Sequence, residues 1–255
     1  MIDDKKFLIT EENVKDYVLK IGEWIKEHIN SSKTNGVVLG MSGGVDCSTV
    51  AAICVKNNIN VHLVLMPYGK EYVGTKSYQD AMELINKFNI DYHMFDIKEA
   101  VDSLKIEDSN KDENLVRLAH ANIRPRVRMT YLYQYAQLNN LLVIGTGNLS
   151  ERTVGYFTKW GDGANDLNPL GMITKKEVYI LAKFLGVPDS IINKKPSADL
   201  WEGQTDEDEL GISYSNIDEY ILNGTCGDLN IDNTIKAKHE RIIHKLKPIE
   251  IFNME

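Results

Sequence analysis

One loop of the sequence combines glycine, hydroxyl and carboxylate groups in an order that suits nucleotide chemistry. It reads MSGGVDCS at residues 41–48 and directly follows an apolar run. Gly43 and Gly44 can adopt positive φ, which lets a ligand approach the backbone closely. A loop that opens a helix also presents unpaired N–H groups to an anion. Asp46 would repel phosphate unless a Mg²⁺ ion lay between them, so the loop predicts a Mg²⁺–nucleotide site.

Two other interpretations of the glycine motifs deserve comparison. The letters SGG alone fit a plain tight turn, and only the apolar strand before them and the helix after them favour a nucleotide loop. The lysine of the motif G-x-x-x-x-G-K-[ST] is absent, which argues against the usual route of γ-phosphoryl transfer. A second stretch, GTGNLSE at residues 145–151, is one glycine short of the dinucleotide fingerprint, because Ser150 occupies the last glycine position. It does not support a nicotinamide dehydrogenase.

Strands and helices that alternate along the chain must position these loops. Apolar runs predict strands at residues 36–41, 61–66, 92–97 and 141–145. Helical periodicity predicts helices at residues 11–30 (with Thr10 as N-cap), 46–56, 77–88, 113–138 (broken or kinked at Pro125), 174–185, 217–222 and 234–245. This order predicts an α/β fold, a Rossmann-like doubly wound parallel sheet with helices on both faces. Both glycine loops follow strands, so we expect them at the carboxyl edge of the sheet, where ligands bind.

Composition narrows the class of protein. The chain has 255 residues, 43% of them hydrophobic, and we expect a single domain over residues 1–255. A net charge of −8 argues against general binding of nucleic acid. Cys47, Cys54 and Cys226 form no CxxC pair, which argues against a zinc or dithiol site. No signal peptide and no apolar run of membrane-spanning length is found, and we expect a cytoplasmic protein without a membrane partner.

Longer segments connect the chain to a known family. SGGVD after an apolar strand resembles the pyrophosphate loop of the N-type ATP pyrophosphatases, which share the adenine nucleotide alpha hydrolase-like fold and cleave ATP between its α and β phosphates. Three further segments resemble NAD synthetase within that superfamily. They are GTGNLSERTVGYFTKWGDGANDLNPLGMITKKEV (residues 145–178), KPSADLWEGQTDEDELGISYSNIDEYI (195–221) and NIRPRVRM (122–129). The resemblance covers about residues 10–250, nearly the whole chain.

The resemblance implies a reaction and its participants. ATP adenylates the pyridine carboxylate of nicotinic acid adenine dinucleotide (deamido-NAD) and pyrophosphate leaves; ammonia then displaces AMP to give NAD. Glutamine-dependent members carry an additional N-terminal amidase domain of the nitrilase type, and we expect none here, so that free ammonia is the nitrogen source. The family is commonly a homodimer with the dinucleotide bound near the subunit interface.

The resemblance also assigns residues to the site. It implies catalytic roles for Asp46, Glu151, Lys175 and Asp166, with Asp46 and Glu151 as Mg²⁺ ligands. The implied ATP contacts are Gly40, Met41, Ser42, Gly43, Gly44, Val45, Asp46, Cys47, Ser48, Thr146, Lys175 and Ser197. The implied deamido-NAD contacts are Arg128, Lys159, Asp166, His244 and Lys245. Cys47 stands where serine is commoner, so a hydroxyl contact to phosphate is lost or moves to Ser48. Asp166 is a candidate acceptor for the proton of ammonium.

Several alternatives stay open at this point. Glu151 and Asp166 also fit ordinary surface carboxylates. Another ATP pyrophosphatase-type ligase, similar to GMP synthetase, would share the SGGVD loop but not the longer segments. A non-catalytic adenine-nucleotide-binding module would not need the second carboxylate, Glu151. Residues 70–76 and 201–209 are polar and contain glycine, so we expect them to act as lids over the site.

Overall fold

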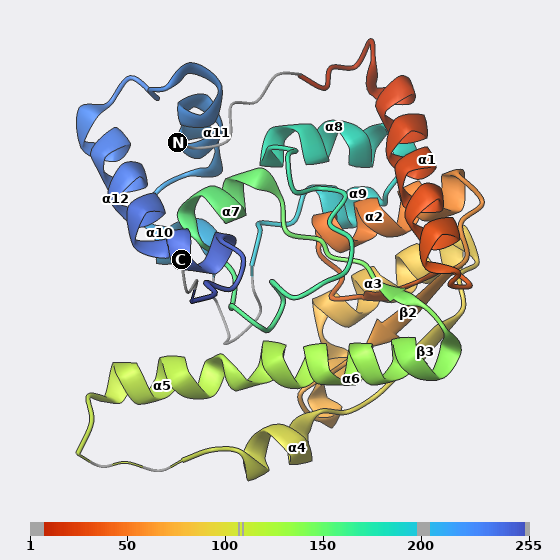
Figure 1. Ribbon diagram of the computed structural model, residues 1–255, viewed down its shortest axis with the longest axis horizontal. Helices are drawn as coiled ribbons and strands as arrows, with labels where there is room; N and C mark the ends of the chain where they lie inside the picture. The colour runs from red at the N-terminus through yellow and green to blue at the C-terminus, as the bar shows by residue number, and fades with distance from the viewer. Residues whose placement is uncertain (1–7, 107, 109, 198–204, 253–255) are drawn as a thin grey trace.

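A four-stranded parallel sheet forms the centre of the protein, shown in Figure 1 as a computed structural model whose described residues are 8–106, 108, 110–197 and 205–252. The strands are β1 (Val37–Gly40), β2 (Val61–Leu65), β3 (Tyr92–Met94) and β4 (Leu142–Val143). Their order is β3-β2-β1-β4, and every pair is parallel. The chain moves outward from β1 to β3 and then returns to the other side of β1. This confirms the doubly wound sheet and places a topological switch point between β1 and β4.

Helices cover both faces of the sheet. They are α1 (Val14–Ser32), α2 (Val45–Lys56), α3 (Lys76–Phe88), α4 (Lys98–Ser103), α5 (Glu113–Ala121), α6 (Ile123–Asn139), α7 (Leu149–Val154), α8 (Lys175–Leu185), α9 (Asp189–Ile192), α10 (Asp206–Leu210), α11 (Tyr214–Asn223) and α12 (Leu229–Leu246), with a 3₁₀ helix η1 at Lys70–Gly74. One face carries α1, α2, α3 and α8, and the other carries α4 and α6. Helices α5 and α6 run almost end to end along the bottom of Figure 1.

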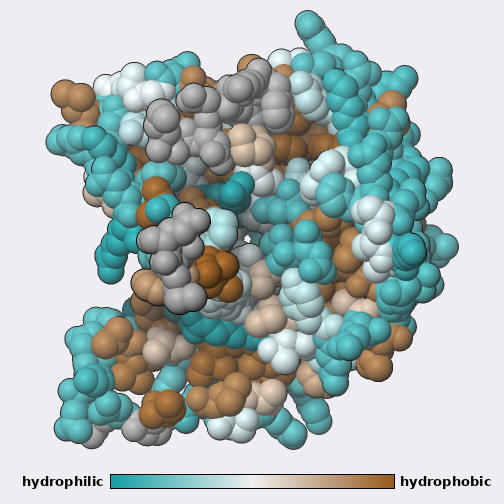
Figure 2. Space-filling model, viewed as in Figure 1, coloured by the Kyte–Doolittle hydropathy of each residue, from teal (hydrophilic) through white to brown (hydrophobic). Residues whose placement is uncertain are grey.

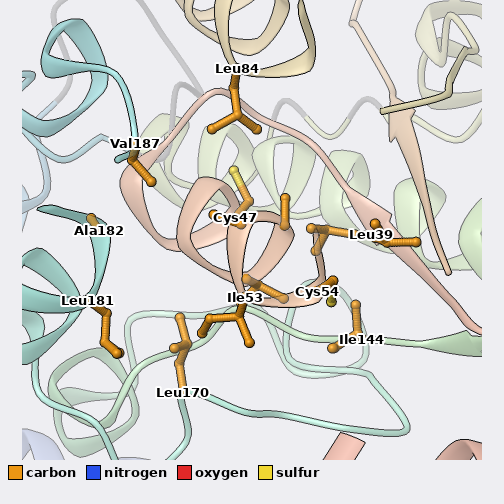
Figure 3. Close-up of a cluster of buried hydrophobic side chains, with 14 of the residues drawn as sticks. Leu39, Cys47, Ile53, Cys54, Leu84, Ile144, Leu170, Leu181, Ala182 and Val187 are labelled. Carbon is orange, nitrogen blue, oxygen red and sulfur yellow. The ribbon is translucent and has the colours of Figure 1, made fainter. Parts of the chain in front are cut away.

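Helix α2 lies at the centre of the larger core. Figure 3 shows its side chains Cys47, Ile53 and Cys54 among residues from β1, α3 and α8. Leu39, Leu84 and Leu181 in this cluster are fully buried. Burial of apolar surface of this kind stabilises by roughly 25 cal/mol per Å². The loop before α2 is therefore attached to the most densely buried helix of the protein.

A separate hydrophobic cluster joins the C-terminal helices to α7. Its buried residues are Val154, Leu210, Ile212, Tyr214, Ile217 and Ile235. In Figure 1 these helices form a group beside the sheet, with α7 between the group and the sheet. This cluster fixes α7, the helix that follows the second glycine loop, against α11 and α12.

The helix predicted over residues 113–138 is two helices, and the break does not fall at Pro125. Helix α5 ends at Ala121 and α6 starts at Ile123, with Asn122 between them. Pro125 lies in the first turn of α6, where its missing N–H would have no intrahelical partner in any case. The proline is therefore accommodated and the helix beyond it is continuous.

The predicted N-cap of the first helix was also wrong. Helix α1 begins at Val14 with Asn13 as N-cap, and the Asn13 side chain accepts a hydrogen bond from the N–H of Thr10. Helices α4, α7, α9 and α10 were not predicted. Of the two predicted lids, residues 70–74 form η1, and the second includes residues 201–204, which lie outside the described part of the chain. None of the described helices is both long and apolar enough to cross a membrane.

Candidate active site

The loop between β1 and α2 presents backbone N–H groups at a helix end. Gly44 is the N-cap of α2 and has extended geometry, with φ −86° and ψ 164°. Because glycine has no side chain to cap the helix, the first N–H groups of α2 remain available to a ligand. Gly43 has φ +81°, and a Cβ atom there would lie 2.2 Å from the carbonyl oxygen of Ser77. Only glycine satisfies both constraints, so the loop is held against α3 in one conformation.

Cys47 and Ser48, the two residues that follow Asp46, are both buried. The Cys47 thiol lies 3.3 Å from the Ser42 hydroxyl and 3.2 Å from the Gly44 carbonyl oxygen, and the residue is 3% exposed. Ser48 is fully buried, and its hydroxyl has no hydrogen-bond partner among the described residues. A contact between the Ser48 hydroxyl and phosphate would therefore require the loop to shift.

Lys175 connects the two glycine loops. Its ammonium lies 2.5 Å from Asp46 Oδ2 and 3.2 Å from Glu151 Oε1. The side chain of Lys175 is 4% exposed, and each carboxylate side chain is 16% exposed. The structure thus brings together three of the four residues to which the sequence assigned catalytic roles. They come from three different helices, α2, α7 and α8.

Local helix caps place these side chains. Asn148 caps α7: its side-chain oxygen accepts the N–H of Glu151, and Glu151 accepts the N–H of Asn148 in return. The amide of Asn148 also donates to Asp46 Oδ1 at 2.9 Å. One capping box therefore fixes both carboxylates. The signal N-x-x-E was present in the sequence and would have located α7.

Helix α8 is held at its first turn by a second set of buried contacts. Thr174 and Glu177 form a capping box, and the other Glu177 oxygen accepts the N–H of Ile9 at 2.7 Å. The Lys175 N–H donates to the Ser150 hydroxyl at 2.9 Å, and that hydroxyl in turn donates to Asp218. These bonds fix the backbone of Lys175 and leave its side chain directed at the two carboxylates.

The charges of the cluster interact strongly. Burial raises the pKa of Glu151 from 4.5 to about 8. The nearby charge of Lys175 lowers this pKa, and the negative charge of Asp46 raises it further. Burial lowers the pKa of Lys175, but Asp46 and Glu151 outweigh it and keep the pKa above its ordinary value of 10.5. The lysine is therefore a permanent cation, whereas Glu151 holds a proton below about pH 8.

Two residues at the site were missed by the assignment of roles. Asp206 is 4% exposed, and burial raises its pKa. The Tyr214 hydroxyl lies 2.9 Å from Asp206 Oδ2 and 3.4 Å from Glu151 Oε1, and Lys175 lies over the Tyr214 ring at 4.9 Å. Both belong to the segment 195–221, but no local pattern in the sequence indicates that they face Glu151. Only the packing of α10 and α11 against α7 brings them there.

The residues assigned to the second substrate fall into separate places. The Lys159 ammonium donates to the His244 carbonyl oxygen at 2.6 Å, and Lys245 donates to the carbonyl oxygens of Gly155 and Phe157. These three predicted contacts, Lys159, His244 and Lys245, therefore meet where the end of α12 lies against the segment after α7. A cleft of about 670 Å³ begins there, and its lining includes Lys245, Thr146, Glu151 and Trp24 of α1.

Asp166 and Arg128 lie elsewhere. Asp166 accepts the N–H of Val143 at 2.8 Å and the hydroxyl of Tyr133 at 3.2 Å, so it ties the end of the sheet to α6. Arg128 donates to the carbonyl oxygen of Met66 at 3.0 Å. Neither contact joins the cluster around Lys175. Ser197, the last described residue before the undescribed stretch 198–204, is half-buried.

The donor atoms of Asp46 and Glu151 fit Mg²⁺. Mg²⁺ prefers oxygen ligands and usually takes one or two carboxylates, with water and substrate phosphates completing its shell. The described residues contain no group of three His, Cys, Asp or Glu side chains placed to hold a metal ion together.

The chain as a whole is similar to several known proteins. Residues 17–249 match the family model of NAD synthase. The NH(3)-dependent NAD(+) synthetase of Carboxydothermus hydrogenoformans is 40% identical over 244 residues, which cover 94% of this chain and 98% of the relative. Among solved structures, the NMN synthetase of Francisella tularensis matches with a TM-score of 0.86 and 36% identity, covering 94% of this chain and 99% of that one. An NH3-dependent NAD synthetase of Campylobacter jejuni matches with a TM-score of 0.76 and 32% identity over the same shares.

Proposed function

The chain belongs to the NAD synthase family, and from this premise we propose that it converts deamido-NAD to NAD, with ATP and ammonia as co-substrates. It is a ligase of the NH3-dependent NAD(+) synthetase type. The GMP synthetase-like ligase and the non-catalytic module, both compatible with the loop alone, are set aside by the family match. The finer proposal concerns the acid substrate, the intermediate and the products.

The observation that carries this proposal is the Asp46–Lys175–Glu151 cluster beside the glycine loop. In the first step the ionised pyridine carboxylate attacks the α phosphorus of ATP, and the bond to the β phosphate breaks, so that pyrophosphate leaves. An ionised carboxylate needs no general base. It needs alignment and donors that stabilise the charge on the phosphate oxygens, which the N–H groups of α2 and the Lys175 ammonium supply. Mg²⁺ held by Asp46 and Glu151 would add further neutralisation of that charge.

In the second step ammonia attacks the adenylated carboxyl carbon, and AMP leaves with the bonding electrons. Ammonium must lose a proton before its nitrogen can attack. We retain Asp166 as the proposed acceptor of that proton, and its exposed carboxylate, bonded to Tyr133, is open to solvent. An Asp166→Asn variant should then lose activity with ammonium while still forming pyrophosphate.

A second candidate substrate is the mononucleotide of nicotinic acid. The solved relative with the TM-score of 0.86 is an NMN synthetase, and amidation of the mononucleotide would use the same two steps. The chemistry at Lys175 is identical for both acids, so the cluster does not distinguish them. Which acid is the preferred substrate depends on whether the site binds the additional adenylate half of the dinucleotide.

The decisive experiment offers both acids to one preparation. The protein is incubated with ATP, Mg²⁺ and ammonium and with either deamido-NAD or nicotinic acid mononucleotide, and the amide, AMP and pyrophosphate are measured. Equal amounts of NAD, AMP and pyrophosphate, with a higher kcat/KM for the dinucleotide, support the proposal. A higher kcat/KM for the mononucleotide would instead identify nicotinic acid mononucleotide as the substrate. Asp46→Ala and Glu151→Ala variants should lose pyrophosphate formation, and formation at the normal rate would contradict their roles.

We also propose a homodimer and a single domain over the chain. Large apolar side chains are exposed on one side of the molecule: Tyr92, Met94, Phe95, Leu115, Leu118 and Leu138. They belong to the edge strand β3 and its end and to α5 and α6, and Figure 2 shows hydrophobic surface along this lower side. Exposed apolar area of this kind marks an interaction surface. A second copy of the chain is the partner that the family resemblance implies.

A further inference from the structure

A second charge cluster, centred on a buried carboxylate, lies beside the glycine loop, and the steps above do not use it. Asp80, on α3, is fully buried. Its Oδ1 lies 2.6 Å from the ammonium of Lys76, and its Oδ2 lies 3.7 Å from the ammonium of Lys194. A buried carboxylate requires such partners. Lys76 comes from the same helix, whereas Lys194 comes from the segment that follows α9.

The ammonium of Lys194 is close to the loop. It donates to the hydroxyl of Ser77 at 2.7 Å, and Ser77 is the residue whose carbonyl oxygen abuts the α-carbon of Gly43. The Lys194 side chain is 23% exposed, compared with 4% for Lys175. Lys194 is therefore held in place by Asp80 and Ser77 of α3 and is still partly exposed to solvent.

The charge of the co-substrate calls for such a cation. ATP carries several negative charges, most of them on the β and γ phosphates that leave as pyrophosphate. Lys175 is already shared by two carboxylates, Asp46 and Glu151. A further cation beside the loop would neutralise charge on the leaving group, which stabilises the breaking bond.

We propose that Lys194 binds the pyrophosphate half of ATP, with Asp80 as the positioning residue that directs its ammonium toward the loop. This assignment rests on the proposed function, since it concerns the leaving group of that reaction. It also links the segment after α9, which leads to Ser197, to the first turn of α3. The loop, α3 and this segment then enclose the leaving group together.

Lys76 provides a matched control. Lys76→Met and Lys194→Met each remove one partner of Asp80, so each costs stability through the same buried carboxylate. Lys76 is 58% exposed and pairs within its own helix, and we assign it no contact with phosphate. Lys194→Arg keeps the positive charge and should retain part of the function.

The test measures binding of MgATP and of AMP by calorimetry, and inhibition by inorganic pyrophosphate in the amidation reaction. For Lys194→Met we expect affinity for MgATP and for pyrophosphate to fall about tenfold or more. AMP, which lacks the β and γ phosphates, should bind as it does to the wild type. Lys194→Arg should lie between, and Lys76→Met should bind all three like the wild type.

Two results would overturn the assignment. The first is unchanged MgATP and pyrophosphate affinity in Lys194→Met. The second is an equal loss in Lys194→Met and Lys76→Met, or an equal loss for ATP and AMP, since the effect would then come from disturbed packing around Asp80. Pyrophosphate formation by the wild type is measured in parallel. If the wild type forms no pyrophosphate, the proposed function fails. If the wild type forms pyrophosphate normally and Lys194→Met binds MgATP and pyrophosphate like the wild type, only the assignment of Lys194 fails.

Discussion

Lys175 and Asp46 are 129 positions apart in the chain, and their side chains meet at 2.5 Å. This contact joins the start of α8 to the start of α2, across the packed interface of the two helices. The site therefore depends on the docking of α8 as much as on the glycine loop. The predictions below test this dependence and its electrostatic consequences.

Loss of the Lys175 charge should harm both activity and stability. Lys175→Met leaves Asp46 and Glu151 without their shared cation. Removal of one partner from a buried ion pair costs about 3–5 kcal/mol, and loss of one donor to a developing charge lowers kcat about 10²–10³-fold. Urea unfolding and kcat measurements check both. Lys176→Met, at an exposed neighbouring position, is the control and should change neither; wild-type kcat in Lys175→Met would exclude the proposed role.

The protonation of Glu151 should make stability depend on pH. The pKa of Glu151 is about 8 in the folded protein, above its ordinary value of 4.5, so the folded state holds an additional proton between these values. The stabilisation that this proton gives the folded state is complete below about pH 4.5 and is lost as pH rises through 8. The free energy of unfolding should fall by up to about 1.4 kcal/mol per pH unit in this range. Unfolding curves of wild type and Glu151→Gln from pH 5 to 8 should differ by this slope. Parallel curves would mean that Glu151 titrates normally.

The two loop glycines should respond differently to alanine. Gly43→Ala places a methyl group 2.2 Å from a backbone oxygen at φ +81°, and strain of this kind costs about 1–3 kcal/mol or more. At Gly44 the nearest atom would be the Ser42 hydroxyl oxygen at 3.4 Å, and φ is −86°. We expect a lower Tm and weaker ATP binding only for Gly43→Ala. Equal losses in both variants would show that flexibility, and not the close approach to Ser77, explains the motif.

The exposed apolar side should control the oligomeric state. Leu118→Glu introduces a charge among the exposed side chains of α5, and we expect the dimer to dissociate to monomers in sedimentation velocity. Leu229→Glu is the control, since Leu229 is 78% exposed at the start of α12 and lies outside the surface proposed above. A monomeric wild type, or a dimer that tolerates Leu118→Glu, would contradict the proposed interface.

Local signals predicted most of the fold but not how its parts meet. Apolar runs located β1 and β2 within a residue, and the helix after the SGG loop started one residue early at Val45. Short helices such as α7 escaped because six residues give too little periodicity. Pro125 misled because a proline breaks a helix only beyond its first turn.

The candidate site was predicted by resemblance more than by physics. The chemistry of Asp46 followed from its place in the loop, whereas the partnership with Lys175 depends on tertiary packing that no spacing in the sequence encodes. Asp206 and Tyr214 show the same limit, since they reach Glu151 only through the packing of the C-terminal helices. Asp80 and Lys194 were not predicted as site residues, because a charged side chain in a polar pattern usually lies on a solvent-exposed surface.

The bond between Ile9 and Glu177 spans 168 positions, and this has a consequence for synthesis. As the chain leaves the ribosome, the strand and helix around the glycine loop emerge long before α8. The N-terminal segment, the loop and the Lys175 turn can lock together only after about two thirds of the chain has been made, and such long-range closure is slow. During that interval Asp46 lacks the contact with Lys175 that it has in the finished protein. We therefore expect the nascent chain to acquire the complete nucleotide site only late in its synthesis.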